Sequence, residues 1–296
     1  MTISFSSESG VVCSVLIPAF NATDTIAETI NSVRAQDFPM PIEILVCDDA
    51  STDNTVSVIS ELVDLDPRVK LLRNSTNQGV SHTRNKLLDS ATGCYIAFLD
   101  SDDVFLPSKI SRTYNVLSVS SAAMVCHGLG YLTAGGGVSG NINASEFLPA
   151  SLIKRTDIGT LRFKTTLPVG EDTDFFRQIM ARCDSIRISD VLTAIRIRPG
   201  SLTDKDWFDK RIVEHWHATR AQGAIAPNSM SSYFDYYKSL GFLTRTNLYR
   251  KWLGQKLGRQ GAGYIFAGKR KTAIGYLCMS LLLSPTYLFH RLFKNR

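Results

Sequence analysis

Between residues 11 and 103, short apolar runs alternate with segments in which apolar residues recur at helical spacing. The runs cover 11–17, 43–47, 69–72 and 95–99, and the helical segments start near Thr25, Thr55 and Ser81. Thr25 and Glu28 have the spacing of a capping box. Strands that alternate with helices build βαβ units and a parallel sheet. We therefore predict an α/β fold with a mainly parallel, Rossmann-like sheet flanked by helices.

Polar residues follow each of the four predicted strands, at 18–21, 48–53, 74–79 and 100–103. In open α/β sheets, ligands bind beyond the carboxyl ends of the strands. We therefore expect the four polar stretches to share one rim, and this rim is the predicted ligand site. Further along, 124–129 and 186–197 are predicted to be strands and 175–181 to be helical.

The acidic stretch Asp100-Ser101-Asp102-Asp103 is the strongest single signal. Three carboxylates within four residues repel one another unless a cation is bound. Divalent cations such as Mg²⁺ are held by one or two carboxylates together with substrate phosphates. A solvated turn before a helix uses the same residue types. The position at the predicted rim favours a metal site over this alternative.

Three other rim residues suit a nucleotide. Asp49 can accept a hydrogen bond from a base or a ribose, and Phe20 can stack on a base. Arg84, close to the start of a helix, favours an anion such as pyrophosphate. Taken alone, each residue also has an ordinary explanation: helix capping for the polar ones and a core position for Phe20.

Two stretches beyond the rim carry further candidates. Glu171-Asp172 opens a helical segment, and a carboxylate placed beside an acceptor hydroxyl can act as a general base. An acidic first turn is also favoured by the helix dipole alone. Arg196, Arg198 and Ser201 can bind phosphate or acceptor, although singly they are ordinary surface residues.

In this order and at these spacings, the stretches resemble family 2 glycosyltransferases, which have the GT-A fold. The resemblance covers roughly residues 11–205. It rests on 15–21 (Val-Leu-Ile-Pro-Ala-Phe-Asn), 48–53 (Asp-Asp-Ala-Ser-Thr-Asp), Asn77-Gln78-Gly79, Arg84-Asn85, 98–103 (Phe-Leu-Asp-Ser-Asp-Asp) and Gly170-Glu171-Asp172.

The resemblance implies a role for each matching position. Asp102, with Asp100, would hold Mg²⁺ or Mn²⁺ on the pyrophosphate of a nucleotide-sugar. Asp172 would be the base of an inverting displacement, with Glu171 supporting it. The implied donor-binding residues are Pro18, Phe20, Asn21, Asp49, Arg84, Asp100 and Ser101.

The resemblance also bears on the reaction. Processive members carry a Gln-x-x-Arg-Trp motif, which is absent here and implies addition of a single sugar. Residues 196–201 resemble a stretch of bacterial enzymes that build surface polysaccharides, in which His often stands at the position of Arg198, so the role of Arg198 stays open. The implied substrates are a nucleotide-sugar, with a UDP-sugar favoured, and a saccharide or lipid-linked saccharide acceptor.

The end of the chain differs in charge from the rest. Residues 236–296 hold twelve of the 33 Lys and Arg and none of the 27 acidic residues. Basic segments with apolar and aromatic residues suit an anionic membrane surface. The apolar run 276–289 contains Pro285 and is shorter than the ~20 residues that span a bilayer. Packing on the catalytic domain or in an oligomer is the alternative for these segments.

We therefore expect a nucleotide-sugar-binding and catalytic domain at 1–205 and a basic, aromatic-rich helical region at 206–296. No signal-peptide pattern is present, and the six cysteines lack Cys-x-x-Cys spacing. These features predict a cytoplasmic protein, peripheral on the inner face of the cell membrane.

Two other functions compete with this prediction. A sugar-nucleotide pyrophosphorylase would carry a Gly-rich, basic loop after the first strand, whereas residues 18–24 hold no Gly, Lys or Arg. A nucleic-acid-binding module would suit the basic tail, but the acidic rim would repel phosphates in the absence of a metal. We therefore expect no nucleic-acid partner.

Overall fold

The structure is a computed structural model that describes residues 10–132, 136–142, 147–167, 170–196 and 270–284, together with single residues between 241 and 257. The chain divides into two compact units. The first comprises residues 1–165 and 171–196, and the second comprises 166–170 and 197–296. The predicted boundary near residue 205 lies outside the described residues, as do Arg198, Ser201 and most of the basic tail.

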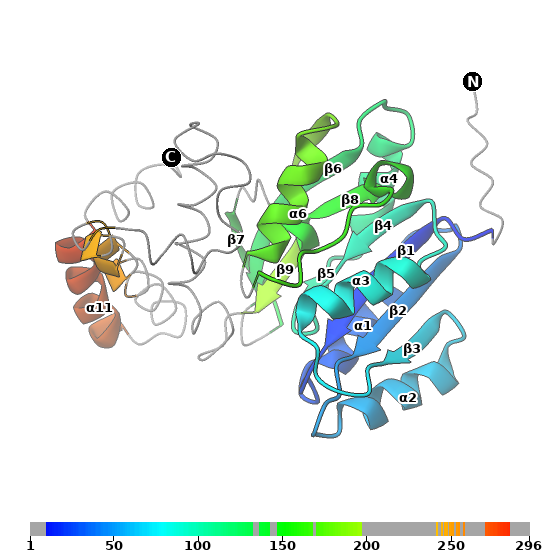
Figure 1. The fold of residues 1–296 in the computed structure, drawn as a ribbon, viewed down its shortest axis with the longest axis horizontal. Coiled ribbons are helices and arrows are strands. Elements are labelled where there is room, and N and C mark those ends of the chain that lie inside the picture. Colours follow the sequence, from blue (N-terminus) through cyan, green and yellow to red (C-terminus); the bar gives the residue numbers. More distant parts are fainter. Residues whose placement is uncertain are drawn as a thin grey trace. The chain divides into compact units, whose positions relative to one another are not determined.

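In the described part of the first unit, nine strands form one sheet (Figure 1). Their spatial order is β3-β2-β1-β4-β8-β6-β9-β5, and β7 pairs with β6. The strands are β1 (Cys13–Ala19), β2 (Ile42–Asp48), β3 (Val69–Arg73), β4 (Tyr95–Phe98), β5 (Val104–Phe105), β6 (Met124–Leu132), β7 (Val138–Ile142), β8 (Ser151–Lys154) and β9 (Ser185–Arg196).

The strands β3, β2, β1 and β4 are mutually parallel, which confirms the predicted Rossmann-like half. The other half is mixed, because β8 runs antiparallel to both β4 and β6, and β5 runs antiparallel to β9. The predicted bounds of the four strands β1 to β4 lie within two residues of the observed bounds at both ends.

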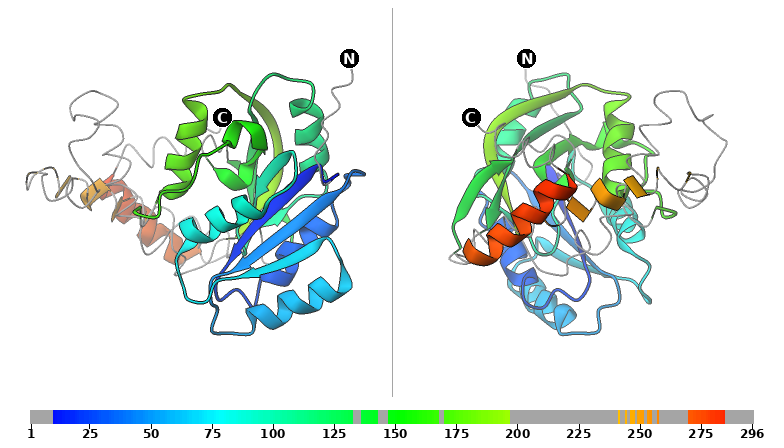
Figure 2. Two further views of the ribbon diagram at one scale, coloured as in Figure 1. Left: turned by 45° about the vertical axis from the view of Figure 1, so that its right-hand side comes forward. Right: turned by 90° about the vertical axis from the view of Figure 1, so that its left-hand side faces the viewer.

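Helices cover both faces of the sheet (Figures 1 and 2). The helices of the first unit are α1 (Ile26–Arg34), α2 (Thr55–Leu65), α3 (Val80–Ser90), α4 (Lys109–Leu117), α5 (Arg155–Ile158) and α6 (Glu171–Met180), with a 3-10 turn at Leu148–Ala150. Ile26, Ile30 and Val33 of α1 are buried on one side, as their helical spacing predicts.

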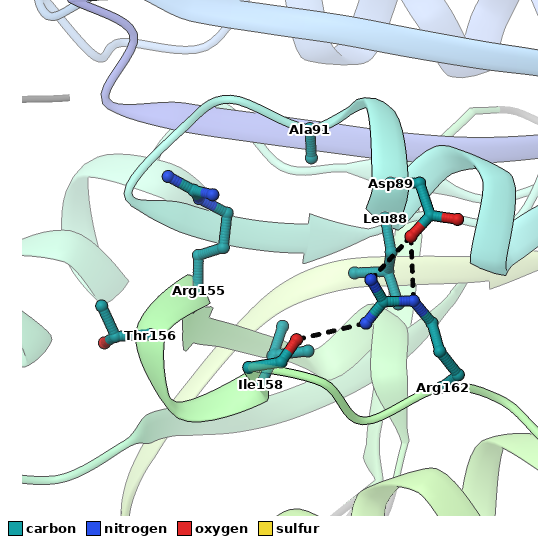
Figure 3. Close-up of a pocket in the computed structure, with 8 residues that line it drawn as sticks. Leu88, Asp89, Ala91, Arg155, Thr156, Ile158 and Arg162 are labelled. Atoms are coloured by element: carbon teal, nitrogen blue, oxygen red, sulfur yellow. Dashed lines mark hydrogen bonds and ion pairs between the residues drawn. The ribbon is translucent and has the colours of Figure 1, made fainter. Parts of the chain in front are cut away.

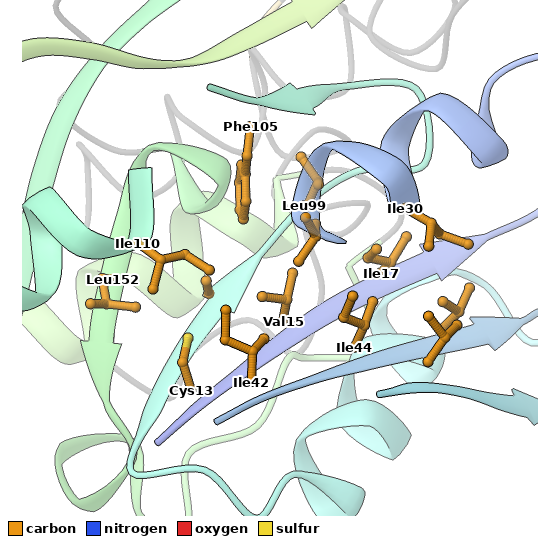
Figure 4. Close-up of a cluster of buried hydrophobic side chains, with 14 of the residues drawn as sticks. Cys13, Val15, Ile17, Ile30, Ile42, Ile44, Leu99, Phe105, Ile110 and Leu152 are labelled. Atoms are coloured by element: carbon orange, nitrogen blue, oxygen red, sulfur yellow. The ribbon is translucent and has the colours of Figure 1, made fainter. Parts of the chain in front are cut away.

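The core consists of two layers, one on each face of the sheet. Side chains alternate between the faces along a strand, so Val15 and Ile17 of β1 pack with Ile30 of α1 on one face (Figure 4). Leu16 of the same strand packs on the other face, where α3 and α6 supply Leu87 and Phe175. Because both faces are covered, β1 and β2 are buried along their whole length.

In the second unit the longest described helix is α11 (Arg270–Leu283). It exposes apolar side chains, with Ile274 60% and Leu282 75% accessible to solvent, and Met279 and Leu281 also exposed. Among the residues that the structure describes, no helix combines the length and the apolar character that a bilayer crossing requires.

The ionisable side chain of Lys109 lies inside the core. Lys109, at the start of α4, is fully buried, and its Nζ donates to the Ser151 carbonyl at 2.9 Å. The ammonium nitrogen also lies 4.2 Å from the centroid of the Phe105 ring. Burial lowers the pKa of Lys109 to about 7, because an apolar environment disfavours the charged form.

We predict that Lys109→Met stabilises the protein at pH 7 by about 1–4 kcal/mol, by analogy with the range found when buried ion pairs are replaced by apolar residues of similar volume. The unfolded chain holds the lysine proton up to a pKa of roughly 10.4, so between pH 7 and 10 it binds more protons than the folded chain. The stability of the wild type therefore rises with pH in this window, and the advantage of methionine shrinks.

Urea unfolding at pH 7 and pH 9.5 measures this effect, with Lys271→Met on the exposed side of α11 as the control. An unchanged or lower stability of Lys109→Met at pH 7 would contradict the prediction.

Candidate active site

The loops after β1, β2 and β3 are joined at the predicted rim. The Asp49 N–H donates to the Ala19 carbonyl, and the Asn74 N–H donates to the Asp48 carbonyl, each at 2.8 Å. Asn21, with a left-handed φ of 48°, joins the first two loops. Its N–H donates to Ser51 Oγ at 2.9 Å, and its Oδ1 accepts the Thr52 N–H at 2.9 Å. Asn21 therefore has a structural role at the rim.

Asp49 holds the loop that leads into α3. The carboxylate is 4% exposed and accepts hydrogen bonds from Asn74 Nδ2 and from the backbone N–H groups of Gln78 and Gly79, at 2.8–2.9 Å. Gly79 has a φ of 86°, which glycine adopts at no steric cost. The nucleobase contact expected of Asp49 stays a prediction beside these bonds.

Pro18 and Phe20 lie at the end of β1. Pro18 is buried in the strand, and Phe20 is 46% exposed. The core position considered for Phe20 is therefore wrong, and an exposed ring at the rim is available for stacking.

The acidic loop 100–103 is held by its backbone. The hydroxyl groups of Thr25 and Thr29 on α1 donate to the Ser101 carbonyl at 2.8 and 3.0 Å, and Thr29 also reaches the Asp103 carbonyl at 2.9 Å. The predicted capping box at Thr25 is wrong, because its hydroxyl makes no bond to the first turn of α1. The hydroxyl is used for the tertiary contact to the loop instead.

Arg196, at the end of β9, holds the same loop from another side. Its N–H donates to Asp103 Oδ1 at 2.9 Å, its Nε donates to the Asp102 carbonyl at 3.1 Å, and its guanidinium pairs with Glu28. Asp103 is 5% exposed, and burial together with the charges of Asp100 and Asp102 raises its pKa well above the usual range. Arg196 and Asp103 therefore shape the loop, and any phosphate contact of Arg196 stays a prediction.

Arg84 of α3 joins the acidic loop to α6. Its Nη2 lies 2.8 Å from Asp100 Oδ1, and its Nη1 lies 2.6 Å from Glu171 Oε1. The residue is 5% exposed. Burial disfavours its charge, but Asp100, Glu171 and Asp172 outweigh burial and raise its pKa. The structure thus brings the predicted metal-site and base residues into one cluster.

The carboxylates of this cluster affect one another. Burial raises the pKa of Asp100, Arg84 opposes that rise, and Asp102 adds to it. Burial likewise raises the pKa of Glu171, with Arg84 opposing and Asp172 adding. Asp172 is half-buried, and its Oδ1 accepts the Thr173 N–H at 2.7 Å, which orients the carboxylate.

The residues fit a cation that the substrate helps to hold. In the described part of the chain, no group of three or more His, Cys, Asp and Glu side chains has the geometry of a metal site. Asp100 and Asp102 supply two carboxylates, and one of these already pairs with Arg84. One or two carboxylates completed by substrate phosphates is a usual arrangement for Mg²⁺.

A cavity of about 370 Å³ lies away from this cluster (Figure 3). Arg155, which lines it, donates from Nε to the Gly93 carbonyl just before β4 begins, so the cavity is at the sheet edge opposite the rim. Arg162, also in its wall, pairs with Asp89 at 2.6 Å.

Comparison with known proteins identifies the family. A family model described as "Glycosyl transferase family 2" matches residues 14–166, more than half of the 296 residues. The chain belongs to glycosyl transferase family 2. The matched segment of this family 2 chain contains the rim loops, the acidic loop and Arg84, and it ends before Glu171.

Two curated relatives illustrate the similarity. The putative teichuronic acid biosynthesis glycosyltransferase TuaG of Bacillus subtilis is 34% identical over 50% of this chain and 59% of its own. The UDP-Glc:alpha-D-GlcNAc-diphosphoundecaprenol beta-1,3-glucosyltransferase WfaP of Escherichia coli is 43% identical over 33% of this chain and 38% of its own. The family 2 chain thus spans about 38–59% of the length of these relatives.

Solved structures share the GT-A fold. S. aureus TarS 1-349 in complex with UDP-GlcNAc has a TM-score of 0.59 at 18% identity, over 90% of this chain and 89% of that one. The mannosyltransferase PcManGT from Pyrobaculum calidifontis, in complex with GDP-Man and Mn²⁺, has a TM-score of 0.56 at 17% identity, over 96% and 88%. The predicted GT-A fold is confirmed.

Sequence reasoning missed Thr29 and Asn74 as residues that hold the rim. Thr29 stands among Ile26, Ile30 and Val33 on the buried side of α1. A hydroxyl on an apolar helix face needs a hydrogen-bond partner. The position of Thr29 on that face was therefore a sequence signal for a contact outside its own helix. Asn74 lies in one of the polar stretches.

Proposed function

We propose that this family 2 chain transfers one sugar from a nucleotide-sugar, with a UDP-sugar favoured, to a saccharide or lipid-linked saccharide in surface-polysaccharide synthesis. The observation that carries the proposal is the buried Arg84, which joins Asp100 of the acidic loop to Glu171 beside Asp172. The name of WfaP states a UDP-Glc donor and an alpha-D-GlcNAc-diphosphoundecaprenol acceptor for that relative, which supports the substrate class.

In the proposed reaction, Asp102 and Asp100 would hold Mg²⁺ or Mn²⁺, and a cation bound there would supply positive charge to stabilise the leaving nucleoside diphosphate. Phe20 stacks on the nucleobase beside Pro18, Asn21 and Asp49. Asp172, oriented by the Thr173 N–H, takes the proton of the acceptor hydroxyl as that oxygen attacks the anomeric carbon. The single displacement inverts the anomeric centre without a covalent intermediate.

Family membership favours this transferase over a pyrophosphorylase. Hydrolysis of a panel of nucleotide-sugars, with and without Mn²⁺, tests the proposal and identifies the donor. If no nucleotide-sugar is hydrolysed or transferred under either condition, the proposal is wrong.

We predict that Asp102→Asn, or excess EDTA on the wild type, lowers turnover by on the order of 10³-fold. The reason is the loss of several kcal/mol of charge stabilisation by the cation. Initial rates on the donor found in the panel measure the effect. Asp89→Asn, at the opposite sheet edge, is the matched control and should retain wild-type rates. Full turnover by Asp102→Asn would refute the metal assignment.

We predict that Asp172→Asn lowers kcat by on the order of 10²-fold or more, the contribution of a general base, with donor affinity near normal. Asparagine keeps the shape and can still accept the Thr173 N–H, but it cannot take a proton. Rates and donor binding are measured on the same preparation. A fall in donor affinity equal to the fall in rate would make Asp172 a binding residue instead.

The membrane part of the proposal rests on α11. Its exposed apolar side chains, Ile274 and Leu282 among them, follow the basic sequence Lys269-Arg270-Lys271. Exposed apolar side chains beside basic residues suit the interface of an anionic membrane, and each basic residue near such a surface contributes about 1 kcal/mol. An acceptor linked to a lipid requires an enzyme at the membrane, so we place the protein on the cytoplasmic face.

We predict that the full-length protein sediments with RNA-free phosphatidylglycerol vesicles at low salt and is released by high salt or detergent. The double variant Ile274→Glu/Leu282→Glu should bind more weakly because glutamate resists burial in the headgroup layer. Leu65→Glu/Val119→Glu, at positions 70% and 84% exposed on the first unit, is the control. Absence of wild-type binding at low salt, or a preference for oligonucleotides, would contradict the membrane assignment.

A further inference from the structure

Arg84 and Asn85, neighbours on α3, both contact residues on the α6 side of the unit. Asn85 Nδ2 donates to the Phe163 carbonyl at 2.9 Å, and its Oδ1 accepts the Phe163 N–H at 2.8 Å. The Phe163 ring stacks on Phe175 of α6, with centroids 4.0 Å apart and planes 11° apart. Asn85 thus fixes a ring against which α6 packs.

Arg84 acts on the same helix by charge. Its Cζ lies 5.5 Å from the centroid of the Phe163 ring, and its Nη1 pairs with Glu171 in the first turn of α6. Glu171 is 8% exposed, and a buried carboxylate needs a counter-charge at close range. Arg84 supplies that charge and so holds the residue immediately before Asp172.

The second terminal nitrogen of Arg84 extends the connection to the acidic loop. Its Nη2 pairs with Asp100 at 2.8 Å, so one planar group contacts both α6 and the loop that carries Asp102. A guanidinium can hold two carboxylates in fixed directions, whereas the point charge of lysine cannot. A single side chain therefore ties the loop that carries Asp102 to the first turn of α6, which carries Asp172.

We propose that Arg84 is a positioning residue that places the base Asp172 relative to the Asp100–Asp102 loop, and that it is not a ligand of the donor phosphates. The proposal rests on the proposed function, whose implied role for Arg84 was contact with the nucleotide. A displacement of about 1 Å between reacting groups can cost on the order of 10² in rate, so the expected effect falls on kcat.

The test is a double-mutant cycle of Arg84→Lys and Glu171→Gln, with UDP in the presence of Mn²⁺ as the binding probe and the donor found in the panel for rates. Each single variant should lower kcat by on the order of 10²-fold and change the Kd for UDP and the donor KM by less than about 3-fold. The double variant should be no slower than the slower single one, since both changes break the same contact.

Arg162→Lys is the matched control, because Arg162 likewise pairs with an aspartate, Asp89, but at the opposite sheet edge. It should leave kcat unchanged. If Arg84→Lys raises the donor KM or the Kd for UDP and leaves kcat unchanged, Arg84 binds the donor and the positioning proposal is overturned. The proposal is also overturned if the kcat effects of Arg84→Lys and Glu171→Gln multiply in the double variant.

Hydrogen exchange of the ligand-free protein tests the positioning role of Arg84 without an activity assay. Arg84→Lys should speed amide exchange in α6 (Glu171–Met180) by at least about 10-fold and leave α2 unchanged, since the loss of a tertiary contact loosens the helix that made it. Equal protection of α6 in both proteins would overturn the proposal. If the wild type turns over no donor, the proposed function fails, and the exchange result still stands on its own.

Discussion

The arrangement of this site depends on the buried guanidinium of Arg84, which pairs with two carboxylates at once. Two carboxylates, Asp100 and Glu171, come close together from separate elements, and their repulsion would push the acidic loop and α6 apart. One cation between them offsets that repulsion and gives both anions a hydrogen-bonded partner. Because Arg84 is nearly inaccessible to water, salt screens its two ion pairs only weakly.

Around this ion cluster, the rim is held mainly by hydrogen bonds to backbone groups. Thr25 and Thr29 hold the acidic loop by its carbonyls, and Asp49 holds the start of α3 by two backbone N–H groups. These contacts hold the acidic loop and the start of α3 through their backbone groups. A loop built in this way is ordered before any ligand arrives, which reduces the entropy that binding must overcome.

Much of the fold was predictable from local patterns. The strands β1 to β4 and helices α1 to α3 follow from apolar runs and helical spacing, and the rim follows from the polar residues at the strand ends. The antiparallel pairing of β8 with β4 and β6 was not predictable, because pairing depends on segments distant in sequence. The same reason explains Thr25, whose hydroxyl bonds to Ser101 rather than to its own helix.

The sequence by itself determined the order of strands and helices from β1 to β4, the polar residues at the ends of these strands, and the family to which the motifs belong, because periodicity and motif spacing are local properties of the chain. The tertiary structure decided which of those polar residues have partners within the protein. Arg84 pairs with residues 16 and 87 positions away, and Arg196 reaches Glu28 across 168 positions. Such contacts arise only when the sheet brings distant loops to one edge, and at Arg84 burial makes the charge depend on the nearest opposite charges.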